Sequence, residues 1–489
     1  MRFVSSYQDA FMKKYLLCLL FPIAFCQLPI LSFSQGCSSL NIQWQSDLDY
    51  HACGSFSPFT MTMMHDALNR PYLYVANKEA GMKVYDISAV ATPSLVATVP
   101  VNLYDSMEVM NLFQNGNYVY LAVGNHFDTL AKQGMAIVDV TNPASPSVTN
   151  YWQSPTGKSG AGAVAVEGNY AYLCAMQTGL IILDVTNKNN IQFVSQFKPD
   201  INFPPVSNPD PKKINLRGIE VKNSIAYCCY DAGGFRIINC TNKNAPKETG
   251  RWCNPAMYTP FDHPKAYNNL VLDDTFIYAA VDYAGVEVLD ISDTGNISML
   301  GWWNPYNAPN TNWFGCNVHA NEIHYEKNCK RVFVSDGKSD MHVIDVSNPA
   351  QPDSCNFYGG VSNNMGTWGL DMWQNQIYLA YICAVVPFGS NWNGVKILTY
   401  NSCTVGVEES DAEDIFIFPV PAADKITIES FQELNLKEVK IQNALGQTVS
   451  SSFSKTGNKT EINISTLAPG FYFLKINDGR KEIIKKFVK

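Results

Sequence analysis

The stretch Gly157-Lys158-Ser159 is the first place in this chain where residue types and spacing suggest chemistry. A GKS followed by an apolar run that ends in Asp184 (GLIILDVTN, residues 179–187) is one pattern of a nucleotide-hydrolysing site. A phosphate-binding loop also needs an earlier glycine, where this chain has Trp152, and a helix whose N-terminus faces the phosphate. The residues after the GKS, GAGAVAVEGN, are instead typical of a β-strand. We therefore interpret the GKS as a chance match in a loop.

Three histidines, His65, His263 and His319, lie near strands that we expect to be innermost. His65 is followed directly by Asp66, and His263 is preceded directly by Asp262. Such a cluster can hold a metal ion or act in acid-base catalysis. Only seven histidines are spread over 489 residues, which favours scattered structural roles. The chain also has no HExxH motif, nucleophile elbow or EF-hand loop. We predict no catalytic residue, no metal and no cofactor.

Several long segments combine aromatic residues with asparagines, as in NPYNAPNTNWFGCNVHA from residue 304. Aromatic faces stack on sugars or anchor protein partners, and amides orient the ligand by hydrogen bonding. The alternative is that these side chains pack the loops against one another. The residues predicted to bind a ligand are Tyr258, Tyr306, Trp313, Trp368 and Trp392.

A six-residue pattern that ends in an acid or amide recurs along the chain and must be part of the framework. Its seven copies are GMKVYD (81–86), GMAIVD (134–139), GLIILD (179–184), GFRIIN (234–239), GVEVLD (285–290), DMHVID (340–345) and GVKILT (394–399). Asp184 is expected to accept backbone N–H groups of the following Thr-Asn turn, a task that asparagine can also perform. The same structural role is predicted for Asp86, Asp139, Asn239, Asp290 and Asp345.

The repeats predict the fold. A tyrosine-rich strand such as YAYLC precedes each copy, a further strand lies ahead of it, and a fourth follows each of the first six copies. Four antiparallel strands in each of seven units predict an all-β protein with a seven-bladed β-propeller over residues 35–403. The seventh unit has no fourth strand, so we expect residues 41–49 to complete it. The loops before the inner strands and those joining second to third strands would then share one face.

The N-terminus and the cysteines predict export. Lys13-Lys14, the apolar run 15–33 and small residues at its end are typical of a signal peptide over residues 1–34, with a membrane anchor as the alternative. Its removal would leave no transmembrane segment and twelve cysteines, an even number suited to an oxidising compartment. Cys403, just past the last strand, is expected to pair with Cys37 or Cys53.

The composition excludes some partners. Charged residues are 16% of the chain, and the formal net charge is -8. Neither value suits an electrostatic interaction with nucleic acid or anionic lipid, so we expect no nucleic-acid partner.

The copies MAIVDV and IILDV resemble the LVIVD repeat of bacterial and archaeal cell-surface proteins, over residues 60–400 approximately. The resemblance implies a surface-exposed propeller and carries no catalytic residues. Residues 404–414 contain the acidic stretch EESDAED, a linker, and the strands after it form a small β-sandwich over residues 415–489. Its LGQ turn, its GFYFLKI strand and its basic end resemble the C-terminal sorting domain of type IX secretion in Bacteroidetes, although Val420 replaces the usual asparagine. That resemblance implies the type IX machinery as a partner, removal of the tail, and either release or attachment to surface lipopolysaccharide.

Three functions remain open from the sequence. The leading hypothesis is a secreted, surface-displayed binding or adhesion propeller for a glycan or a partner protein. The main alternative is a secreted enzyme that acts on polysaccharide, with His263 and His319 in the central funnel. The third is a structural component of the cell envelope that binds no small ligand.

Overall fold

The structure is a computed structural model of the chain. It describes residues 40–53, 60–206, 209–257, 266–308, 310–360, 365–384, 388–401, 415–419, 422–430, 438–443, 447–450, 454–456, 459–477 and 482–489. The chain divides into two compact units between residues 400 and 401, and each unit is described by itself. The predicted signal peptide (1–34) and acidic linker (404–414) lie outside the described residues.

The described part of the first unit consists of seven four-stranded antiparallel sheets. The first three are β2–β5 (Thr62–His65, Tyr72–Ala76, Met82–Asp86, Ser94–Val99), β6–β9 (Val109–Asn115, Tyr118–Val123, Lys132–Asp139, Ser147–Lys158) and β10–β13 (Ala163–Glu167, Tyr170–Cys174, Leu180–Asp184, Gln192–Phe197). The next three are β14–β17 (Gly218–Lys222, Ile225–Cys229, Phe235–Asn239, Lys247–Trp252), β18–β21 (Tyr267–Asp273, Phe276–Val281, Gly285–Asp290, Ser298–Trp303) and β22–β25 (Ala320–Glu326, Arg331–Asp336, Met341–Asp345, Asp353–Tyr358). The seventh combines β26–β28 (Thr367–Trp373, Gln376–Tyr381, Trp392–Tyr400) with β1 (Ile42–Ala52).

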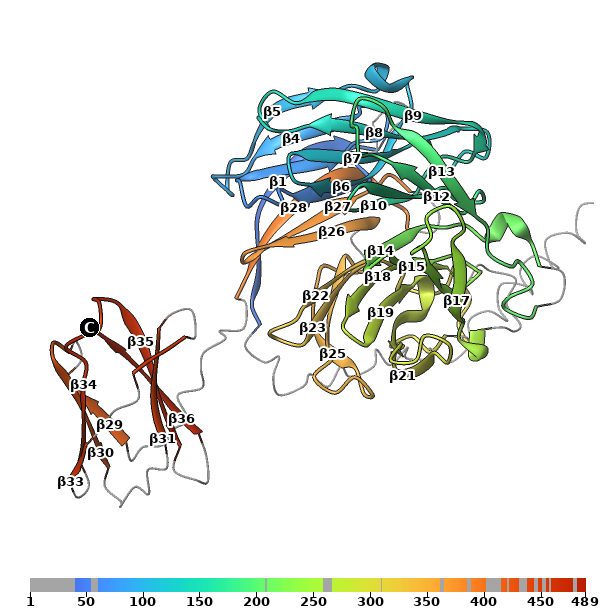
Figure 1. Ribbon diagram of the computed structural model, residues 1–489. Helices are drawn as coiled ribbons and strands as arrows, with labels where there is room; N and C mark the ends of the chain where they lie inside the picture. Colours follow the sequence, from blue (N-terminus) through green and yellow to red (C-terminus); the bar gives the residue numbers. More distant parts are fainter. Residues whose placement is uncertain are drawn as a thin grey trace, which may run out of the picture. The chain divides into compact units, whose positions relative to one another are not determined.

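The first strands of successive sheets contact one another in a closed ring, from β2 through β6, β10, β14, β18 and β22 to β26 and back to β2. The sheets therefore radiate from a common centre, and the predicted all-β propeller fold is confirmed (Figure 1). The only helices among the described residues are the short 3₁₀ turns η2 (Val101–Tyr104), η3 (Pro211–Lys213), η4 (Pro255–Met257) and η5 (Asp282–Ala284). None of the helices described is long and apolar enough to span a membrane.

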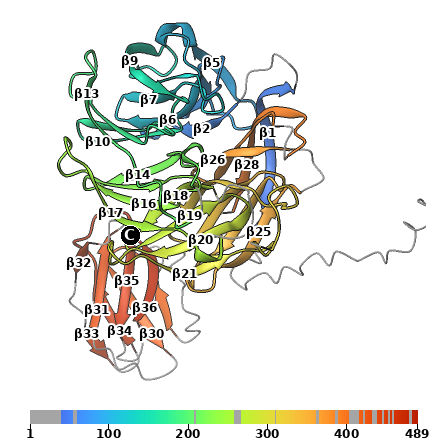
Figure 2. The same ribbon diagram turned by 90° about the vertical axis from the view of Figure 1, so that its right-hand side faces the viewer.

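Strand β1 lies beside β28, so the N-terminal strand completes the last sheet (Figure 2). The register runs antiparallel from Ile42 opposite Tyr400 to Ala52 opposite Trp392. It shifts by one residue between Trp44 and Ser46, opposite the same repeat position at which the third and fourth strands of the other six sheets shift. A bulge of this kind increases strand twist, so β1 has the geometry of a fourth strand.

A disulfide fastens the end of β1. Cys53 is bonded to Cys383 in the connection between β27 and β28, with the two Cα atoms 5.5 Å apart. The predicted pairing of Cys53 with Cys403 is therefore wrong, because a cysteine forms only one disulfide. The backbone N–H of Cys53 also donates to Asn391 O and holds the strand end at this connection. Cys37 and Cys403 lie outside the described residues. Cys329 and Cys355 are also disulfide-bonded.

The last residue of each of the first six repeat copies caps the turn that follows it. Asp184 Oδ1 accepts the backbone N–H of Thr186 at 2.8 Å, and Asn239 Oδ1 accepts that of Thr241 at 2.9 Å. The side-chain and backbone hydrogen bonds from Thr186 lower the pKa of Asp184. The same contact, from residue i to the N–H of residue i+2, is made by Asp86, Asp139, Asp290 and Asp345. These side chains are parts of turns in the framework.

The first residue of most repeat copies is glycine because of its backbone conformation and the close approach of the neighbouring strand. Gly179 has a φ of 89°, and a Cβ atom there would lie 2.2 Å from Phe197 O of the neighbouring strand. Gly81, Gly234 and Gly285 share this conformation, with φ between 77° and 90°. Glycine reaches positive φ without a steric penalty, which lets the chain turn into the third strand against the fourth.

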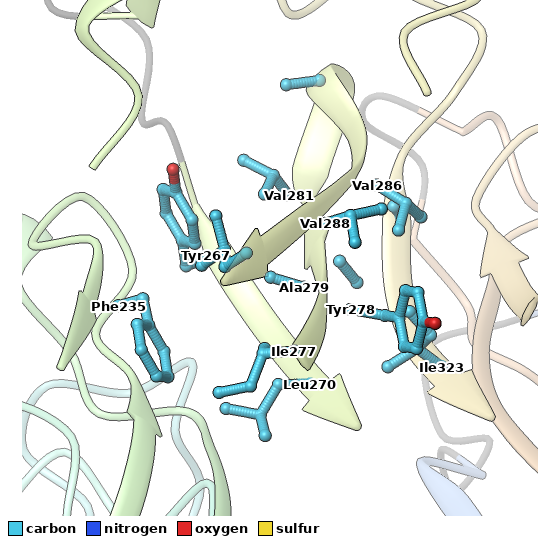
Figure 3. Close-up of a cluster of buried hydrophobic side chains, with 14 of the residues drawn as sticks. Phe235, Tyr267, Leu270, Ile277, Tyr278, Ala279, Val281, Val286, Val288 and Ile323 are labelled. Atoms are coloured by element: carbon cyan, nitrogen blue, oxygen red, sulfur yellow. The ribbon is translucent and has the colours of Figure 1, made fainter. Parts of the chain in front are cut away.

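Apolar side chains fill the space between sheets. In one cluster Phe235 of β16 lies on the face of β19 that carries Ile277, whereas Tyr278 of β19 lies on the opposite face beside Ile323 of β22 (Figure 3). The same cluster therefore joins three consecutive sheets, which is how a ring of sheets obtains a core without a layer of helices.

The described part of the second unit is a β-sandwich of two four-stranded sheets. One contains β29 (Ile415–Phe418), β30 (Lys425–Ser430), β34 (Lys459–Asn463) and β33 (Ser454–Thr456), and the other contains β32 (Thr448–Ser450), β31 (Glu438–Asn443), β35 (Phe471–Asn477) and β36 (Glu482–Val488). Their shared core includes Ile426, Ile441, Ile462, Leu474 and Phe487. The Nζ atom of the terminal Lys489 donates to the carbonyl oxygens of Ile464, Ser465 and Leu467.

The inner strands of the propeller also carry carboxyl groups. Glu322 of β22 accepts a hydrogen bond from Thr62 Oγ1 of β2 at 3.1 Å, past the intervening strand β26. Burial raises the pKa of Glu322 to about 7, and burial likewise raises the pKa of Glu220 on β14 to about 7. Both groups hold a proton over part of the neutral range because the charged form is poorly solvated there.

We predict that Gly179→Ala destabilises the protein more than Gly168→Ala does. Gly168 also has a positive φ, 58°, but a Cβ atom there meets nothing within 4 Å. The control should therefore cost about 1 kcal/mol for backbone strain alone, while Gly179→Ala should cost at least about 3 kcal/mol because of the added clash. Urea unfolding followed by tryptophan fluorescence measures both; equal midpoints would contradict this role of Gly179.

Stability should also decline as pH rises through 7. Glu322 and Glu220 have folded-state pKa values raised above the ordinary 4.5, so their contribution is complete below pH 4.5 and is lost as pH rises through about 7. Glu322→Gln should remove on the order of 1–2 kcal/mol of the difference in unfolding free energy between about pH 5 and pH 8. Glu220→Gln should act in the same direction. A pH slope unchanged in both variants, measured by urea titration, would rule out this assignment.

Candidate functional site

A cavity of about 540 Å³ lies in the propeller unit where segments before the inner strands meet connections between second and third strands. Six of the seven sheets contribute to it. Its lining is Met61, Lys78, Asn125, Phe127, Lys212, Lys213, Asn215, Arg217, Asp231, Ala266, Asn268, Asp282, Trp313, His319, Asn321, Trp368, Ile382, Cys383, Ala384 and Phe388. These residues are far apart in sequence, so the ring of sheets creates the site.

Four aromatic rings line the cavity. Trp368 of β26 meets Phe127 edge to face, with ring centroids 6.0 Å apart, and Phe127 is 52% exposed. Trp313 and Phe388 both pack edge to face against the ring of His319, at 5.4 and 5.2 Å. The cavity therefore offers aromatic surface from the second, sixth and seventh sheets.

His319 is held in a buried polar constellation. Its Nδ1 lies 2.8 Å from Asp282 Oδ1, and the Nε1–H of Trp313 donates to Asp282 Oδ2 at 2.6 Å. The backbone N–H of His319 donates to Asp336 Oδ1 at 2.6 Å. Its Nε2 is buried and has no hydrogen-bond partner among the described residues. With the proton on Nδ1, Nε2 carries a lone pair that can accept a proton or a ligand hydrogen bond.

Two amides of the cavity lining, the partly exposed Asn268 and the buried Asn321, join neighbouring sheets. Asn268 Nδ2 donates to Ala320 O at 2.8 Å, and Asn321 Nδ2 donates to His319 O at 2.9 Å and to Thr367 O at 3.3 Å. These hydrogen bonds link β18 to β22 and the start of β22 to β26. The two amides hold the beginnings of these inner strands in place, which helps to preorganise this side of the cavity.

Two of the five predicted ligand residues line this cavity, Trp313 and Trp368. Tyr306 is partly buried and packs against the core cluster instead. Trp392 does not reach the cavity: it is 5% exposed and stacks on Tyr381 and Tyr50, with centroids 4.5 and 5.5 Å away, because β28 directs it into the core of the seventh sheet. Tyr258 lies outside the described residues.

The two candidate histidines that the structure describes, His65 and His319, have different partners and do not form one cluster. His65 Nδ1 lies 2.9 Å from Asp371 Oδ2, whereas the neighbouring Asp66 is bound by Arg70 Nη2 at 2.6 Å. Burial lowers the pKa of His65, but the hydrogen bond and charge of Asp371 together outweigh it, so the net pKa is raised. His263 and Asp262 lie outside the described residues, within which no three His, Cys, Asp or Glu side chains are placed to hold a metal.

The GKS stretch lies on β-structure. Lys158 is the last residue of β9, and the Gly157 N–H donates to Ser154 Oγ at 2.8 Å. The residues after it lead into β10, so within the described part of the chain the GKS is followed by a strand and not by a helix.

Several lining residues escaped the sequence-based prediction, notably Arg217, Asp282, His319 as a partner of Asp282, and Phe388. Asn268 and Asn321 had a detectable signal, since each stands at the beginning of a predicted inner strand. Asp282 and Phe388 had none, because they lie in connections of unequal length that no repeat pattern aligns.

Comparisons with known proteins agree with this architecture. The LVIVD repeat profile matches residues 68–101, 108–151, 159–198 and 331–358, and the secretion system C-terminal sorting domain matches residues 416–489. No curated protein matches the chain.

Solved structures are similar in fold. The structure of U3-55K has a TM-score of 0.51 at 8% identity, covering 73% of this chain and 99% of its own. The WD40 β-propeller domain of Doa1 has a TM-score of 0.47 at 8% identity, covering 73% and 97%. At such identities the likeness concerns the fold alone. The repeats, the ring of sheets and the matched tail together identify the chain as an LVIVD-repeat β-propeller protein with a type IX secretion sorting domain, secreted or exposed at the cell surface.

Proposed function

We propose that the propeller is a surface-displayed binding module whose cavity takes a glycan. The observation that carries the proposal is the combination of aromatic rings, Trp313, Trp368, Phe127 and Phe388, with buried amides in one concave site of about 540 Å³. Pockets of this size suit small ligands or short polymer segments. Aromatic faces provide contact area for sugar rings, while polar side chains of the lining offer hydrogen bonds to hydroxyl groups.

A protein partner is the competing occupant. Stable protein interfaces bury about 800 Å² on each partner and are mostly broad rather than hollow. The aromatic rings here are instead distributed around a cavity, with Phe127 the most exposed of the four. This arrangement favours a chain of sugars that enters the cavity.

We predict that Trp368→Ala weakens glycan binding by the secreted protein at least about tenfold, because a central aromatic contact contributes about 1.5 kcal/mol or more. Trp44→Ala is the matched control: Trp44 is 53% exposed on β1 and lies outside the cavity. Glycan-array screening followed by calorimetry measures both variants.

Equal losses in the two tryptophan variants would contradict binding at the cavity. If no glycan binds, but the unmodified protein binds a surface protein and the Trp368→Ala variant does not, the cavity is still a binding site and its ligand is a protein. If neither ligand class binds, the structural role in the cell envelope is favoured.

A second candidate function is cleavage of polysaccharide, favoured by the contact between Asp282 and His319. A carboxylate that orients Nδ1 leaves the buried Nε2 as the candidate general base, an arrangement used in several hydrolytic sites. Trp313 holds Asp282 from its other oxygen.

If the protein cleaves polysaccharide, His319→Gln should lower the rate of product release by at least about 100-fold, because it removes the base. His65→Gln is the control, since His65 pairs with Asp371 and does not line the cavity. Mass spectrometry of released oligosaccharides gives the readout. Turnover that survives His319→Gln would exclude this mechanism, and binding without turnover in the unmodified protein would favour the first candidate.

A further inference from the structure

The cavity is basic although the chain as a whole is acidic. The formal net charge of the chain is -8, yet the lining contains four cationic side chains and only two carboxylates. The cations are Lys78, Lys212, Lys213 and Arg217, and the carboxylates are Asp231 and Asp282. Charge of this sign inside a cavity raises the local concentration of anionic ligands.

Both carboxylates are already engaged by the protein. Asp282 accepts from Trp313 and faces His319 Nδ1, as described above. Asp231 Oδ2 accepts from Asn215 Nδ2 at 2.9 Å, and Arg217 Nε lies 3.4 Å from the same oxygen. Burial raises the pKa of Asp231.

Positive charge extends across the cavity. The pKa of His126, which adjoins the lining residues Asn125 and Phe127, is well below its ordinary value, first because of burial and then because of the charges of Arg217 and Lys78. Lys78 is itself paired with Glu79 and with Glu108, 2.8 Å away, so Arg217 is the more available cation.

Arg217 lines the cavity and has N–H donors that have no protein acceptor among the described residues. Apart from the Nε contact with Asp231, its guanidinium has no hydrogen-bond acceptor among the described residues, so both Nη atoms lack a protein partner. Its side chain is 24% exposed and lines both the large cavity and a smaller void of about 40 Å³ beside Asn268 and Glu322. A guanidinium with two free Nη groups matches the paired oxygens of a carboxylate or sulfate.

A neutral sugar would be a poor occupant of this position. A neutral sugar would displace water from the guanidinium of Arg217 and replace it with neutral hydroxyl acceptors, which form weaker hydrogen bonds. An anionic group would form charge-assisted hydrogen bonds in place of that water. Lys212 and Lys213, exposed on η3, add attraction at longer range.

We propose that the cavity selects an anionic oligosaccharide, with a carboxylate or sulfate ester of the sugar bound by the Nη groups of Arg217. The proposal rests on the glycan-binding function above and specifies its ligand class. Trp368 and Trp313 then contact the sugar rings, and the two lysines of η3 guide the charged ligand toward the cavity.

The test compares three oligosaccharides of equal length, one neutral, one carboxylated and one sulfated, against the full secreted protein by calorimetry. At least one acidic probe should bind about tenfold or more tightly than the neutral one. The affinity of that probe should decrease when the salt concentration is raised from about 50 mM to about 300 mM. Whichever acidic probe binds more tightly identifies the group that Arg217 recognises.

Arg217→Gln should weaken binding of the acidic probe by about 10- to 100-fold and leave neutral binding unchanged. Arg251→Gln is the matched control, because Arg251 is 45% exposed on the outer strand β17 and lies outside the cavity. The double variant Lys212→Gln/Lys213→Gln lies on an exposed segment and should reduce the salt dependence of the affinity for the acidic probe. If Arg217→Gln unfolds, this double variant decides the test.

Equal affinity for neutral and acidic probes, or a preference for the neutral one, would overturn the anionic ligand class while leaving glycan binding intact. Acidic binding that is indifferent to both the arginine and the lysine variants would overturn it as well. Failure of all three probes to bind would overturn the inference together with the proposed function.

Discussion

The pairing of β1 with β28 is the constraint on which the propeller depends. It joins Ile42 to Tyr400 across nearly the whole unit and removes the open sheet edge that β28 would otherwise expose. Bringing such distant residues together costs chain entropy, and the disulfide between Cys53 and Cys383, 330 residues apart, reduces that cost in the unfolded state. Asp49 of β1 also accepts hydrogen bonds from Lys83 and Tyr85, so the closing strand is tied to the first sheet as well as to the last.

Closure determines the cavity. Its residues come from six sheets, and two of the amides, Asn268 and Asn321, donate hydrogen bonds to the sheet next in the ring, at Ala320 O and Thr367 O. The Asp282–His319 contact likewise joins a turn of the fifth sheet to the segment before the sixth. Such contacts exist only when consecutive sheets are in ring order. The charge of the cavity, opposite to that of the whole chain, is also a product of this convergence and cannot be read from composition.

The prediction succeeded where the signal is local and repeated. The four-stranded units follow from alternating apolar residues and turn residues within short stretches, and the capping contacts of Asp184 and Asn239 span only two residues. It was incomplete at the site. Trp313 and Trp392 have the same residue type in similar aromatic, asparagine-containing segments, yet one lines the cavity and the other is buried against Tyr381. The difference is that Trp392 begins strand β28, which directs its side chain into the core, whereas Trp313 lies in a connection. The local sequence pattern around the two tryptophans does not distinguish these two environments.

The amino-acid sequence by itself determined the repeated β-unit, the propeller class and the sorting domain at the C-terminus, because periodic patterning and turn chemistry act over a few residues. Only the tertiary structure decided which side chains share the cavity, that Cys53 meets Cys383, and that both Nη groups of Arg217 find no acceptor among the described residues. The physical reason is distance along the chain: side chains from connections of unequal length become neighbours only after the ring of sheets has closed, and their orientation then depends on packing between sheets.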